Sequence, residues 1–405
     1  MISVVFLGGI FPDDHKKEII EKSNAGVQFA ADLLQKKLIK GLGDHQDIDL
    51  KVVSLPFLSV YPNGYRDRWI PGWGDKENVS YVGFDNCVLL RNISRTINLY
   101  RHLKKEKMIS GQKKWIIVYS AHTPFNLVAT YLKKKSKELR IAVIVPDLPI
   151  HMSDTKSRLY WFMKRIDSKV FQYLCKNVDA FIPLTEGINS FVNPTLSKPY
   201  LIMEGICNDF SSHLKLSVDG CCRVVYTGGI SHQYGIPHLL EAFTFLDSNV
   251  YELYLCGTGS AEQIVLDFAK RHQNVHYLGQ KTDVFCQELQ NSANILINPR
   301  MNDSEYTKYS FPSKTLEYLA TGNPVISYKL DGIPKEYDDV LIYPCDESCA
   351  GLAETIRKVF TEPLLSKKAR ETKQRELCEK KEIGVTVNRI VTLLEDKNCE
   401  NNRNK

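Results

Sequence analysis

Short apolar runs alternate with longer amphipathic segments along the whole chain, and this alternation restricts the possible folds more than any other feature of the sequence. The apolar runs are rich in Val, Ile and Leu, and most of them lack the polar–apolar alternation of a half-exposed strand. Near-continuous apolar strands that alternate with helices are typical of parallel sheets covered on both faces. The sequence therefore predicts an α/β fold.

The predicted strands fall into two groups. Those of the first half are 3–8, 48–55, 79–84, 115–120, 140–146, 180–184 and 200–203. Those of the second half are 223–228, 251–257, 275–279, 293–299, 324–328 and 339–344. Helical patterns lie between them, for example 26–42, 157–177, 235–246 and 261–272. The apolar periodicity lapses over 204–222, and 405 residues exceed one ordinary core, so we expect two doubly wound domains. Such domains bind ligands at the carboxyl ends of their strands, and the cleft between them is the expected site.

Composition places the chain among globular proteins, with 43% hydrophobic and 25% charged residues. No apolar run approaches the roughly 20 residues of a spanning helix, and "MISVVFLGGIF" lacks a basic leader and a cleavage site. The eleven cysteines include no CxxC pair, which favours reduced thiols over a disulfide framework or a zinc site. We therefore expect a cytoplasmic protein.

The positive charge is concentrated in the first half. Residues 1–210 carry 30 Lys and Arg against 21 Asp and Glu, whereas the remainder carries 23 against 26. The basic runs are 100–107, 111–115 and 131–140. They are either solvated helix faces or a surface for an anionic partner, such as a membrane leaflet or a phosphorylated acceptor. Nucleic acid is disfavoured because aromatic stacking residues do not interleave with these runs.

The stretch "YSFPSKTLEYLATG" (309–322) predicts a helix that starts at a cation. Lys314 lies just inside the helix start, Glu317 follows within one turn, and Gly322 is placed to end the helix. A helix start attracts anions, and a carboxylate accepts hydrogen bonds from sugar hydroxyls. The alternative is an ordinary capped helix with a solvated Lys and Glu.

Several stretches together resemble a known family. These are "FLGGIFP", "SNAGVQFAA", "IVPDLP", "VVYTGGISHQYGIPHLLEAF", "LYLCGTGSAEQIV", "VHYLGQKTDV", "ANILINPR" and "YSFPSKTLEYLATGNPVIS". They resemble retaining nucleotide-sugar glycosyltransferases of the GT-B fold, family 4 type, and most closely the bacterial capsule and exopolysaccharide subset. The resemblance implies two Rossmann-like domains facing a cleft. It predicts an acceptor-binding domain at 1–212, a donor-binding domain at 213–375 and a helix within 376–405 that returns to the first domain.

Three positions depart from the family pattern. The usual pair of glutamates is half present, because Glu317 matches the ribose-binding member whereas Tyr309 replaces the other. Many relatives carry an Arg and a Lys on the donor diphosphate where this chain has Gly229 and Tyr234. A leaving diphosphate needs fixed positive partners, and these are usually the largest catalytic term. We expect Arg300 and Lys314 to replace the missing cations; the alternative for Arg300 is a surface side chain after a buried strand.

The remaining candidates are assigned partly by resemblance. Asp147, in "IVPDLP", is expected to face the anomeric centre or the acceptor hydroxyl; otherwise it is a turn aspartate beside proline. Gly26 is expected to let phosphate approach a helix start; otherwise it is a plain helix entry. The full predicted donor set is Gly26, Gly229, Ser231, Thr258, Gly259, Gln280, Phe311, Pro312, Ser313 and Glu317. "CGTGS" (256–260) lacks the spacing and position of a dinucleotide fingerprint, so no nicotinamide cofactor is expected. His122, His151 and His232 lack ligand spacing and no DxD motif is present, so no metal is expected.

These observations predict transfer of a sugar from a nucleotide-diphosphate sugar, UDP-linked, to a carbohydrate acceptor, lipid-linked, with retention of configuration. The partners expected are the nucleotide sugar, this acceptor and an anionic membrane surface, without nucleic acid. Two alternatives stay open, because a fold does not determine a function. One is a nucleotide-sugar epimerase or hydrolase with the same fold, and the other is a catalytically silent accessory subunit.

Overall fold

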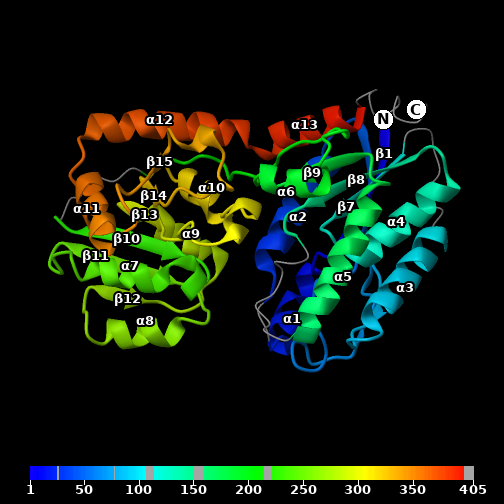
Figure 1. Ribbon diagram of the computed structural model, residues 1–405, viewed down its shortest axis with the longest axis horizontal. Helices are drawn as coiled ribbons and strands as arrows, with labels where there is room; N and C mark the ends of the chain where they lie inside the picture. The colour runs from blue at the N-terminus through cyan, green and yellow to red at the C-terminus, as the bar shows by residue number, and fades with distance from the viewer. Residues whose placement is uncertain (25–26, 77, 106–113, 149–157, 214–219, 396–405) are drawn as a thin grey trace. The chain divides into compact units, whose positions relative to one another are not determined.

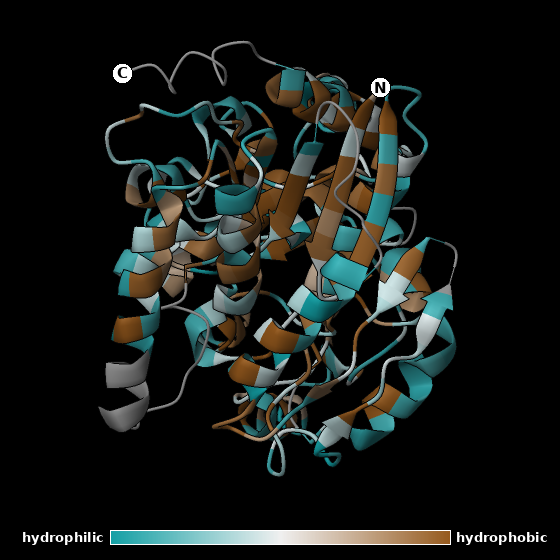
Figure 2. Cartoon of the chain, turned by 90° about the vertical axis from the view of Figure 1, so that its right-hand side faces the viewer, coloured by the Kyte–Doolittle hydropathy of each residue, from teal (hydrophilic) through white to brown (hydrophobic). Residues whose placement is uncertain are grey.

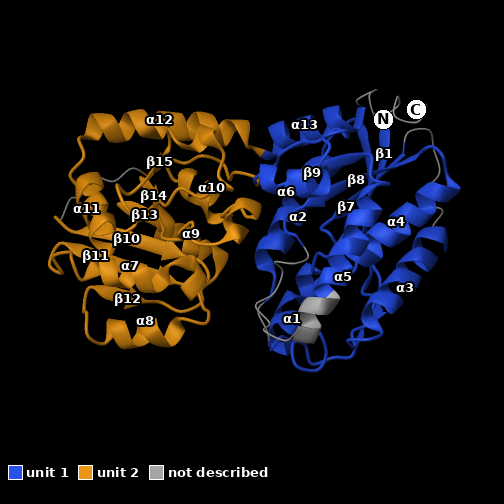
Figure 3. Cartoon of the chain, in the orientation of Figure 1, with its two compact units in different colours: residues 1–204, 383–405 blue, residues 205–382 orange. Residues whose placement is uncertain are grey.

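The computed structural model describes residues 1–24, 27–76, 78–105, 114–148, 158–213 and 220–395 (Figure 1). The chain forms two compact units (Figure 3). Unit 1 consists of Met1–Glu204 together with Ile383–Lys405, and unit 2 consists of Gly205–Glu382. The predicted boundaries lay at 212 and 375, whereas the units divide after Glu204 and after Glu382. Residues 376–382 therefore belong to unit 2 and not to the returning helix. In the described part of the chain, no helix is long and apolar enough to span a bilayer.

Unit 1 is built on a seven-stranded sheet with the order β4-β5-β2-β1-β7-β8-β9. Its strands are β1 (Ile2–Gly8), β2 (Ile48–Ser54), β4 (Gly74–Lys76), β5 (Val79–Tyr81), β7 (Lys114–Tyr119), β8 (Leu139–Val145) and β9 (Ala180–Pro183). All neighbours run parallel except β4 and β5. The central strands are buried along nearly their whole length, as their apolar sequences require, and Figure 2 shows hydrophobic residues dominating them.

Seven helices belong to the described part of unit 1. They are α1 (Lys16–Lys22), α2 (Phe29–Gly43), α3 (Arg91–Lys105), α4 (Thr123–Lys135), α5 (Arg158–Cys175), α6 (Glu186–Val192) and α13 (Ile383–Glu395). A small antiparallel ribbon of β3 (Trp69–Ile70) and β6 (Phe84–Asp85) completes the unit. Helix α13 packs on α2, where a Cβ at Gly41 would lie only 2.6 Å from Ile383 Cγ1. The last described helix is therefore an integral part of unit 1.

Unit 2 is a six-stranded, all-parallel sheet with the order β12-β11-β10-β13-β14-β15. Its strands are β10 (Cys222–Thr227), β11 (Tyr251–Cys256), β12 (Val275–Tyr277), β13 (Ile295–Asn298), β14 (Val325–Ser327) and β15 (Leu341–Ile342). Its helices are α7 (Ile236–Phe243), α8 (Glu262–Ala269), α9 (Asp283–Asn291), α10 (Lys314–Leu319), α11 (Cys349–Phe360) and α12 (Leu364–Lys380). One apolar cluster joins strands to α7, α8 and α11, and a second joins strands to α10 and α12. Helices thus cover both faces, which confirms the predicted doubly wound α/β fold.

Two strand predictions were wrong. Residues 200–203 form an isolated bridge to Phe181 and no strand, although Leu201 N–H and Met203 N–H donate to Phe181 O and Pro183 O of β9, both at 3.0 Å. The predicted strand 79–84 is split between β5 and β6, which lie in different sheets. The division falls at Gly83, where a Cβ would lie 2.8 Å from both Gly72 N and Ile70 O. The close approach of another backbone there interrupts the strand.

The strand order identifies one point in each sheet where the connections change direction. In unit 1 the chain passes from β1 to β2 on one side and later places β7 on the other side of β1. In unit 2 it passes from β10 to β11 on one side and later places β13 on the other side of β10. Open α/β sheets bind ligands outside the carboxyl ends of the strands at such switch points.

Candidate active site

The switch point of unit 2 is formed by glycine-rich loops that are hydrogen-bonded to one another. After β10, Gly228 N–H donates to Cys256 O and Ile230 N–H donates to Thr258 O, both at 2.9 Å. After β11, Gly257 N–H donates to Gly279 O at 2.9 Å. The loops that carry Gly229, Ser231, Thr258, Gly259 and Gln280 therefore lie side by side at the carboxyl ends of β10, β11 and β12.

Two of these glycines are required by close backbone approach. Gly257 has φ 142°, and a Cβ there would lie 1.8 Å from Gly228 O. Gly235 has φ 73°, and a Cβ there would lie 2.0 Å from Pro299 O. Any side chain at either position would push the loops apart. The β10 loop is thus held directly against both the β11 loop and the end of β13.

Lys314 and Glu317 form an ion pair on the first turn of α10. Lys314 Nζ lies 2.8 Å from Glu317 Oε2, and the side chains remain 38% and 27% exposed. Burial by itself would lower the pKa of Lys314, but the charge and hydrogen bond of Glu317 raise this pKa above its ordinary value. Lys314 is therefore a fully charged ammonium that solvent can still reach.

A hydrogen-bonded network lies beneath this pair. Gln290, on α9, donates from Nε2 to Thr227 Oγ1 at 2.8 Å and reaches Glu317 Oε2 at 3.5 Å. Tyr318 OH accepts from Thr227 N–H at 2.8 Å and donates to Thr227 O at 3.0 Å. Because Thr227 ends β10, these bonds fix the start of α10 against the central strand of unit 2.

Arg300 follows β13 and is buried between aromatic rings, with only 5% of its surface exposed. Its guanidinium carbon lies 4.8 Å from the ring centre of Tyr306 and 5.9 Å from that of Tyr234, and Nη1 donates to Ser310 Oγ at 3.2 Å. The ring of Tyr234 also covers Gly229, where a Cβ would lie 2.8 Å from Tyr234 Cε2. Arg300 therefore stands beside the two positions, Gly229 and Tyr234, where the family pattern has cations, and it is not a surface side chain.

The other predicted donor residues divide by environment. Gly229, Thr258, Gly259, Gln280 and Ser313 are exposed, and Pro312 is half-buried. Phe311 is buried in the core against Tyr337, with 5.3 Å between ring centres. Ser231 is 9% exposed, and its buried Oγ finds no hydrogen-bond partner among the described residues. A buried hydroxyl without a partner could donate a hydrogen bond to an oxygen atom of a ligand.

The start of α10 differs in detail from the expected capped helix. Ser313 precedes the helix, but its side chain makes no capping hydrogen bond, and the helix is six residues long. The predicted packing face is buried, and Gly322 has φ 72°, which confirms the predicted helix end. The macrodipole of so short a helix is small, so Lys314 supplies most of the positive charge at this point.

Asp147 belongs to unit 1, where it follows β8 and is half-buried. Tyr119, at the end of the neighbouring β7, is fully buried; burial first and then the charge of Asp147 raise the pKa of this phenol above its ordinary range. Gly26 lies outside the described residues, and α2 begins at Phe29. Asp147 is thus the predicted site residue that the structure places at the strand ends of unit 1.

A second group at the strand ends of unit 1 was not predicted as a site. His122 follows β7, and Arg95 of α3 donates from Nη1 to His122 Nε2 at 2.9 Å. In the sequence, His122 stands out only as a possible metal ligand. A lone histidine after a strand gives no signal by itself, because its partner lies 27 residues earlier on another helix.

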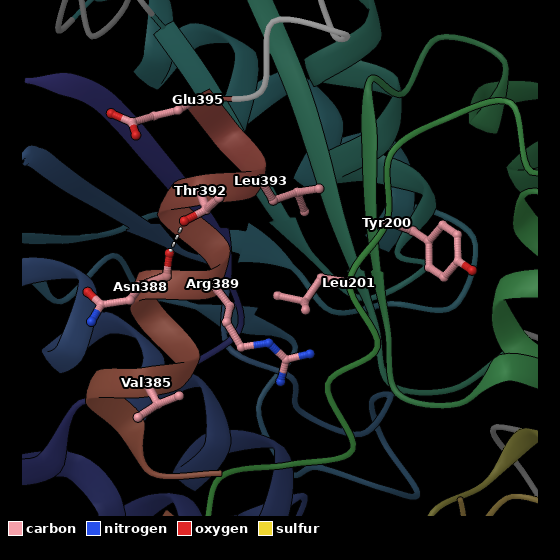
Figure 4. A pocket seen from close by; sticks show the side chains of 8 residues that line it. All are labelled: Tyr200, Leu201, Val385, Asn388, Arg389, Thr392, Leu393 and Glu395. Atoms are coloured by element: carbon pink, nitrogen blue, oxygen red, sulfur yellow. Dashed lines mark hydrogen bonds between the residues drawn. The ribbon is translucent and has the colours of Figure 1, made fainter. Parts of the chain in front are cut away.

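A groove elsewhere in unit 1 involves none of the predicted residues. It runs between α13 and the segment 200–201 (Figure 4). Its lining residues are Tyr200, Leu201, Val385, Asn388, Arg389, Thr392, Leu393 and Glu395. Among the residues that the structure describes, no group of three or more His, Cys, Asp or Glu is placed to hold a metal ion.

Comparisons with known proteins agree with this architecture. Residues 221–362 match the family described as "Glycosyl transferases group 1". No curated protein sequence matches the chain.

Three solved structures share the fold over nearly the whole chain. A sucrose-phosphate synthase from Thermosynechococcus elongatus is 13% identical, covering 97% of this chain and 99% of that one, with a TM-score of 0.65. A trehalose-6-phosphate protein from E. coli bound with UDP-2-fluoro glucose is 11% identical, covering 97% and 99%, with a TM-score of 0.65. The lipopolysaccharide outer core galactosyltransferase WaaB is 13% identical, covering 97% and 99%, with a TM-score of 0.62. The chain therefore has the GT-B fold of these glycosyltransferases, and its second unit carries a domain that matches the glycosyl transferases group 1.

Proposed function

We propose that the protein is a retaining glycosyltransferase that moves a sugar from a UDP-linked donor to a carbohydrate acceptor in polysaccharide assembly. The observation that carries the proposal is the accessible Lys314–Glu317 pair beside the interlocked glycine loops of unit 2. The match to glycosyl transferases group 1 covers these same loops, and a structural neighbour is bound with UDP-2-fluoro glucose.

The donor diphosphate would lie at the switch point of unit 2. Lys314 and Arg300 would neutralise the charge that develops on the leaving phosphate, and preorganised charges of this kind usually make the largest contribution to catalysis. The unpaired hydroxyl of Ser231 would donate to a phosphate oxygen. Glu317 would exchange its bond to Lys314 for hydrogen bonds from the ribose hydroxyls.

Asp147 would act on the other side of the reaction. In this proposal its carboxylate meets positive charge at the anomeric carbon or orients the acceptor hydroxyl. Because that interaction forms chiefly in the transition state, Asp147→Asn should retain donor binding and lose transfer.

Nucleotide binding provides the first experiment. UDP, GDP and ADP are compared by thermal shift, since a ligand present at 100 times its dissociation constant stabilises a protein by about 2.7 kcal/mol. Stabilisation by UDP that is lost in Lys314→Ala supports the donor site. Equal responses of the parent and Lys314→Ala to all three nucleotides would contradict it.

Sugar transfer then separates the alternatives. A transferase releases UDP from a UDP-sugar in proportion to added acceptor, whereas an epimerase or hydrolase acts without acceptor. An accessory subunit shows neither activity, so Asp147→Asn would change nothing. Steep loss of acceptor-dependent UDP release in Asp147→Asn, with unchanged UDP affinity by calorimetry, supports the proposed mechanism.

A lipid-linked acceptor and contact with an anionic membrane belong to the same proposal. The described basic residues at the ends of α3 and α4 supply an exposed surface, and we call Lys104, Lys105, Lys134 and Lys135 the α3–α4 lysine patch. Lys133 is not part of it, because its Nζ lies 2.6 Å from Asp179 Oδ2 and donates to Asn177 O. The run 111–115 lies largely outside the described residues.

A further inference from the structure

The switch point of unit 1 is bordered by a buried basic cluster. Arg91 and Arg95 lie one turn apart on α3, and Ser120 and His122 lie in the loop between β7 and α4. We call these four residues the β7–α4 cluster. Arg95 and Ser120 are 1% and 2% exposed, whereas Arg91 and His122 are partly exposed. The cluster is therefore internal but reachable from solvent on one side.

Two hydrogen bonds and an aromatic ring hold the guanidinium group of Arg95 in place. Its Nη1 donates to His122 Nε2, and its Nη2 donates to Pro56 O, both at 2.9 Å. Its guanidinium carbon lies 4.1 Å from the ring centre of Phe84. Arg91 is held by a hydrogen bond from Nη2 to Leu58 O. Both cations are thus held in place by contacts within unit 1.

The bond from Arg95 determines the tautomer of His122. A guanidinium only donates hydrogen bonds, so His122 Nε2 must accept, and the proton of the neutral imidazole must reside on Nδ1. Burial first, then the charges of Arg95, Arg91 and Lys164, lower the pKa of His122 well below its ordinary value, which keeps the ring neutral. His122 therefore presents an N–H donor at Nδ1.

The cluster has donors without acceptors. Arg91 Nε, Arg95 Nε and His122 Nδ1 are all buried and find no hydrogen-bond partner among the described residues. The Ser120 hydroxyl is buried and unpaired in the same way. A carboxylate near the start of α4, that of Asp167, accepts a hydrogen bond from Thr123 Oγ1. Within the described residues neither arginine is within ion-pair distance of a carboxylate.

Two buried guanidinium groups without a counter-charge are unfavourable. Burial lowers the pKa of Arg91 to about 10, and burial together with the charge of Arg91 lowers that of Arg95 far below its ordinary value. Burying an unpaired charge or an unsatisfied donor is costly, so such groups are normally retained with a partner. An anion bound among these donors would satisfy both needs at once.

The backbone at the same place is strained. Ser120 has φ 81°, a conformation that residues with a side chain seldom adopt. It directly follows β7, the strand that pairs with β1, at the point where the fold places ligands. Strained backbone of this kind tends to occur at functional sites.

We propose that the β7–α4 cluster binds an oxyanion, a phosphate or carboxylate, that belongs to the sugar acceptor. The forked donors of Arg91 and Arg95 suit the two oxygens of such a group, and His122 Nδ1–H adds a third, neutral donor. The oxyanion site follows from unit 1 alone, whereas its assignment to the acceptor rests on the proposed function.

Binding of inorganic phosphate tests the site directly. The titration uses the full chain carrying Lys314→Ala, which removes the accessible cation of unit 2, and chloride keeps the ionic strength constant. We expect saturable binding by calorimetry that Arg91→Gln weakens by about tenfold or more, as for loss of a charged donor. Arg68→Gln is the control, because that exposed arginine already pairs with Asp85. No phosphate binding, or equal binding with and without Arg91, would overturn the proposal.

The imidazole of His122 gives a second readout that needs no change at the arginines. In ¹⁵N-histidine-labelled protein, the resonance that His122→Gln removes should report a neutral ring protonated on Nδ1, and phosphate should shift it. A proton on Nε2, or a chemical shift that phosphate leaves unchanged, would contradict the proposal. Acetate and a sugar phosphate, titrated in parallel, distinguish a carboxylate site from a phosphate site. UDP binding is measured separately, so failure of the donor assignment leaves this test intact.

Discussion

At the scale of single residues, the pairing of Lys314 with Glu317 would determine how a donor enters the proposed site. The two groups pair at 2.8 Å, so in the proposed site a diphosphate would attract Lys314 while ribose hydroxyls take its place on Glu317. The two exchanges compensate each other only if both occur. Donor binding should therefore depend on the pair as a unit.

A double-mutant cycle measures this dependence. Glu317→Gln should weaken UDP binding by about tenfold, because an ionised acceptor is lost. Lys314→Ala should also weaken UDP binding and should lower turnover by about 100-fold. The loss of UDP affinity in the double variant should be smaller than the sum of the two single losses, since residues in one network are coupled. The cycle is read by calorimetry and initial rates. The exposed pair Glu305–Lys308, with the same spacing, is the control and should show no effect.

A thiol near the same site should be unusually reactive. The hydrogen bond with Cys256, whose Sγ lies 3.5 Å away, and the charge of Lys314 outweigh burial and lower the pKa of Cys286 to about 7. Thiolates are the reactive form, so iodoacetamide at pH 7 should label the half-buried Cys286 faster than the exposed Cys345. Peptide mass spectrometry gives both rates. Lys314→Ala should slow labelling of Cys286 alone, and an unchanged rate would remove Lys314 from this explanation.

The sequence indicated more of the residue contacts in the candidate site of unit 2 than of those in the β7–α4 cluster of unit 1. Lys314, Glu317 and their packing face are contiguous, so a single helical pattern contained them. Arg300 could be placed because it directly follows a strand. The contact of Arg95 with His122 could not be found, because it joins a helix to a loop across the sheet edge and neither residue belongs to a motif.

At the scale of elements, α3 and α4 present the described part of the basic surface. The sequence showed three consecutive lysines, 133–135, but helical geometry turns Lys133 toward Asp179 and leaves Lys134 and Lys135 exposed. Tyr100 of α3 and Tyr131 of α4 pack edge to face at 5.3 Å, which ties the two helices together. Residues 200–203 do bond to β9, through Leu201 N–H to Phe181 O and Met203 N–H to Pro183 O, yet they form only an isolated bridge and not the predicted strand.

Liposome binding tests the role of this surface. Charge reversal of the α3–α4 lysine patch should abolish sedimentation with anionic vesicles, since each lysine near the surface contributes about 1 kcal/mol. UDP affinity should stay unchanged. Lys133→Met is the matched control, because it should reduce stability without reducing sedimentation. Equal sedimentation of the reversed variant and the parent would identify the patch as a solvated surface.

At the scale of the whole molecule, two histidines with lowered pKa values link stability to pH. The pKa of His122 is depressed, and burial also lowers that of His238 despite the opposing charges of Glu241 and Glu347. Below about pH 6.5 these histidines bind protons in the unfolded chain but stay neutral in the folded chain. The free energy of unfolding therefore falls as pH decreases.

Denaturant unfolding between pH 6.5 and 5 measures this link. The free energy of unfolding should fall by up to about 1.4 kcal/mol per pH unit for each histidine that stays neutral. His122→Asn should reduce that slope, whatever its effect on stability at pH 7.5. The charges that face His122 are those of Arg95, Arg91 and Lys164. If His122→Asn leaves the slope unchanged, the pH dependence belongs to other groups.

Unit 1 is discontinuous in the chain, and this has a consequence for synthesis. The face of α2 around Gly41 is covered by α13, yet all of unit 2 is translated between these two helices. Residues 44–382 separate the two helices, so at 5–20 residues per second that face stays uncovered for roughly 17 to 68 seconds. Ile390 is fully buried on α13, so Ile390→Ala should lower the free energy of unfolding in urea by about 2–5 kcal/mol. The same change should lengthen the time that chaperones stay bound to nascent chains. Thr392 is exposed on the same helix, and Thr392→Ala should have neither effect. In the cell, unit 2 would be a finished domain attached to an unfinished one, and the first domain would be completed only after the second.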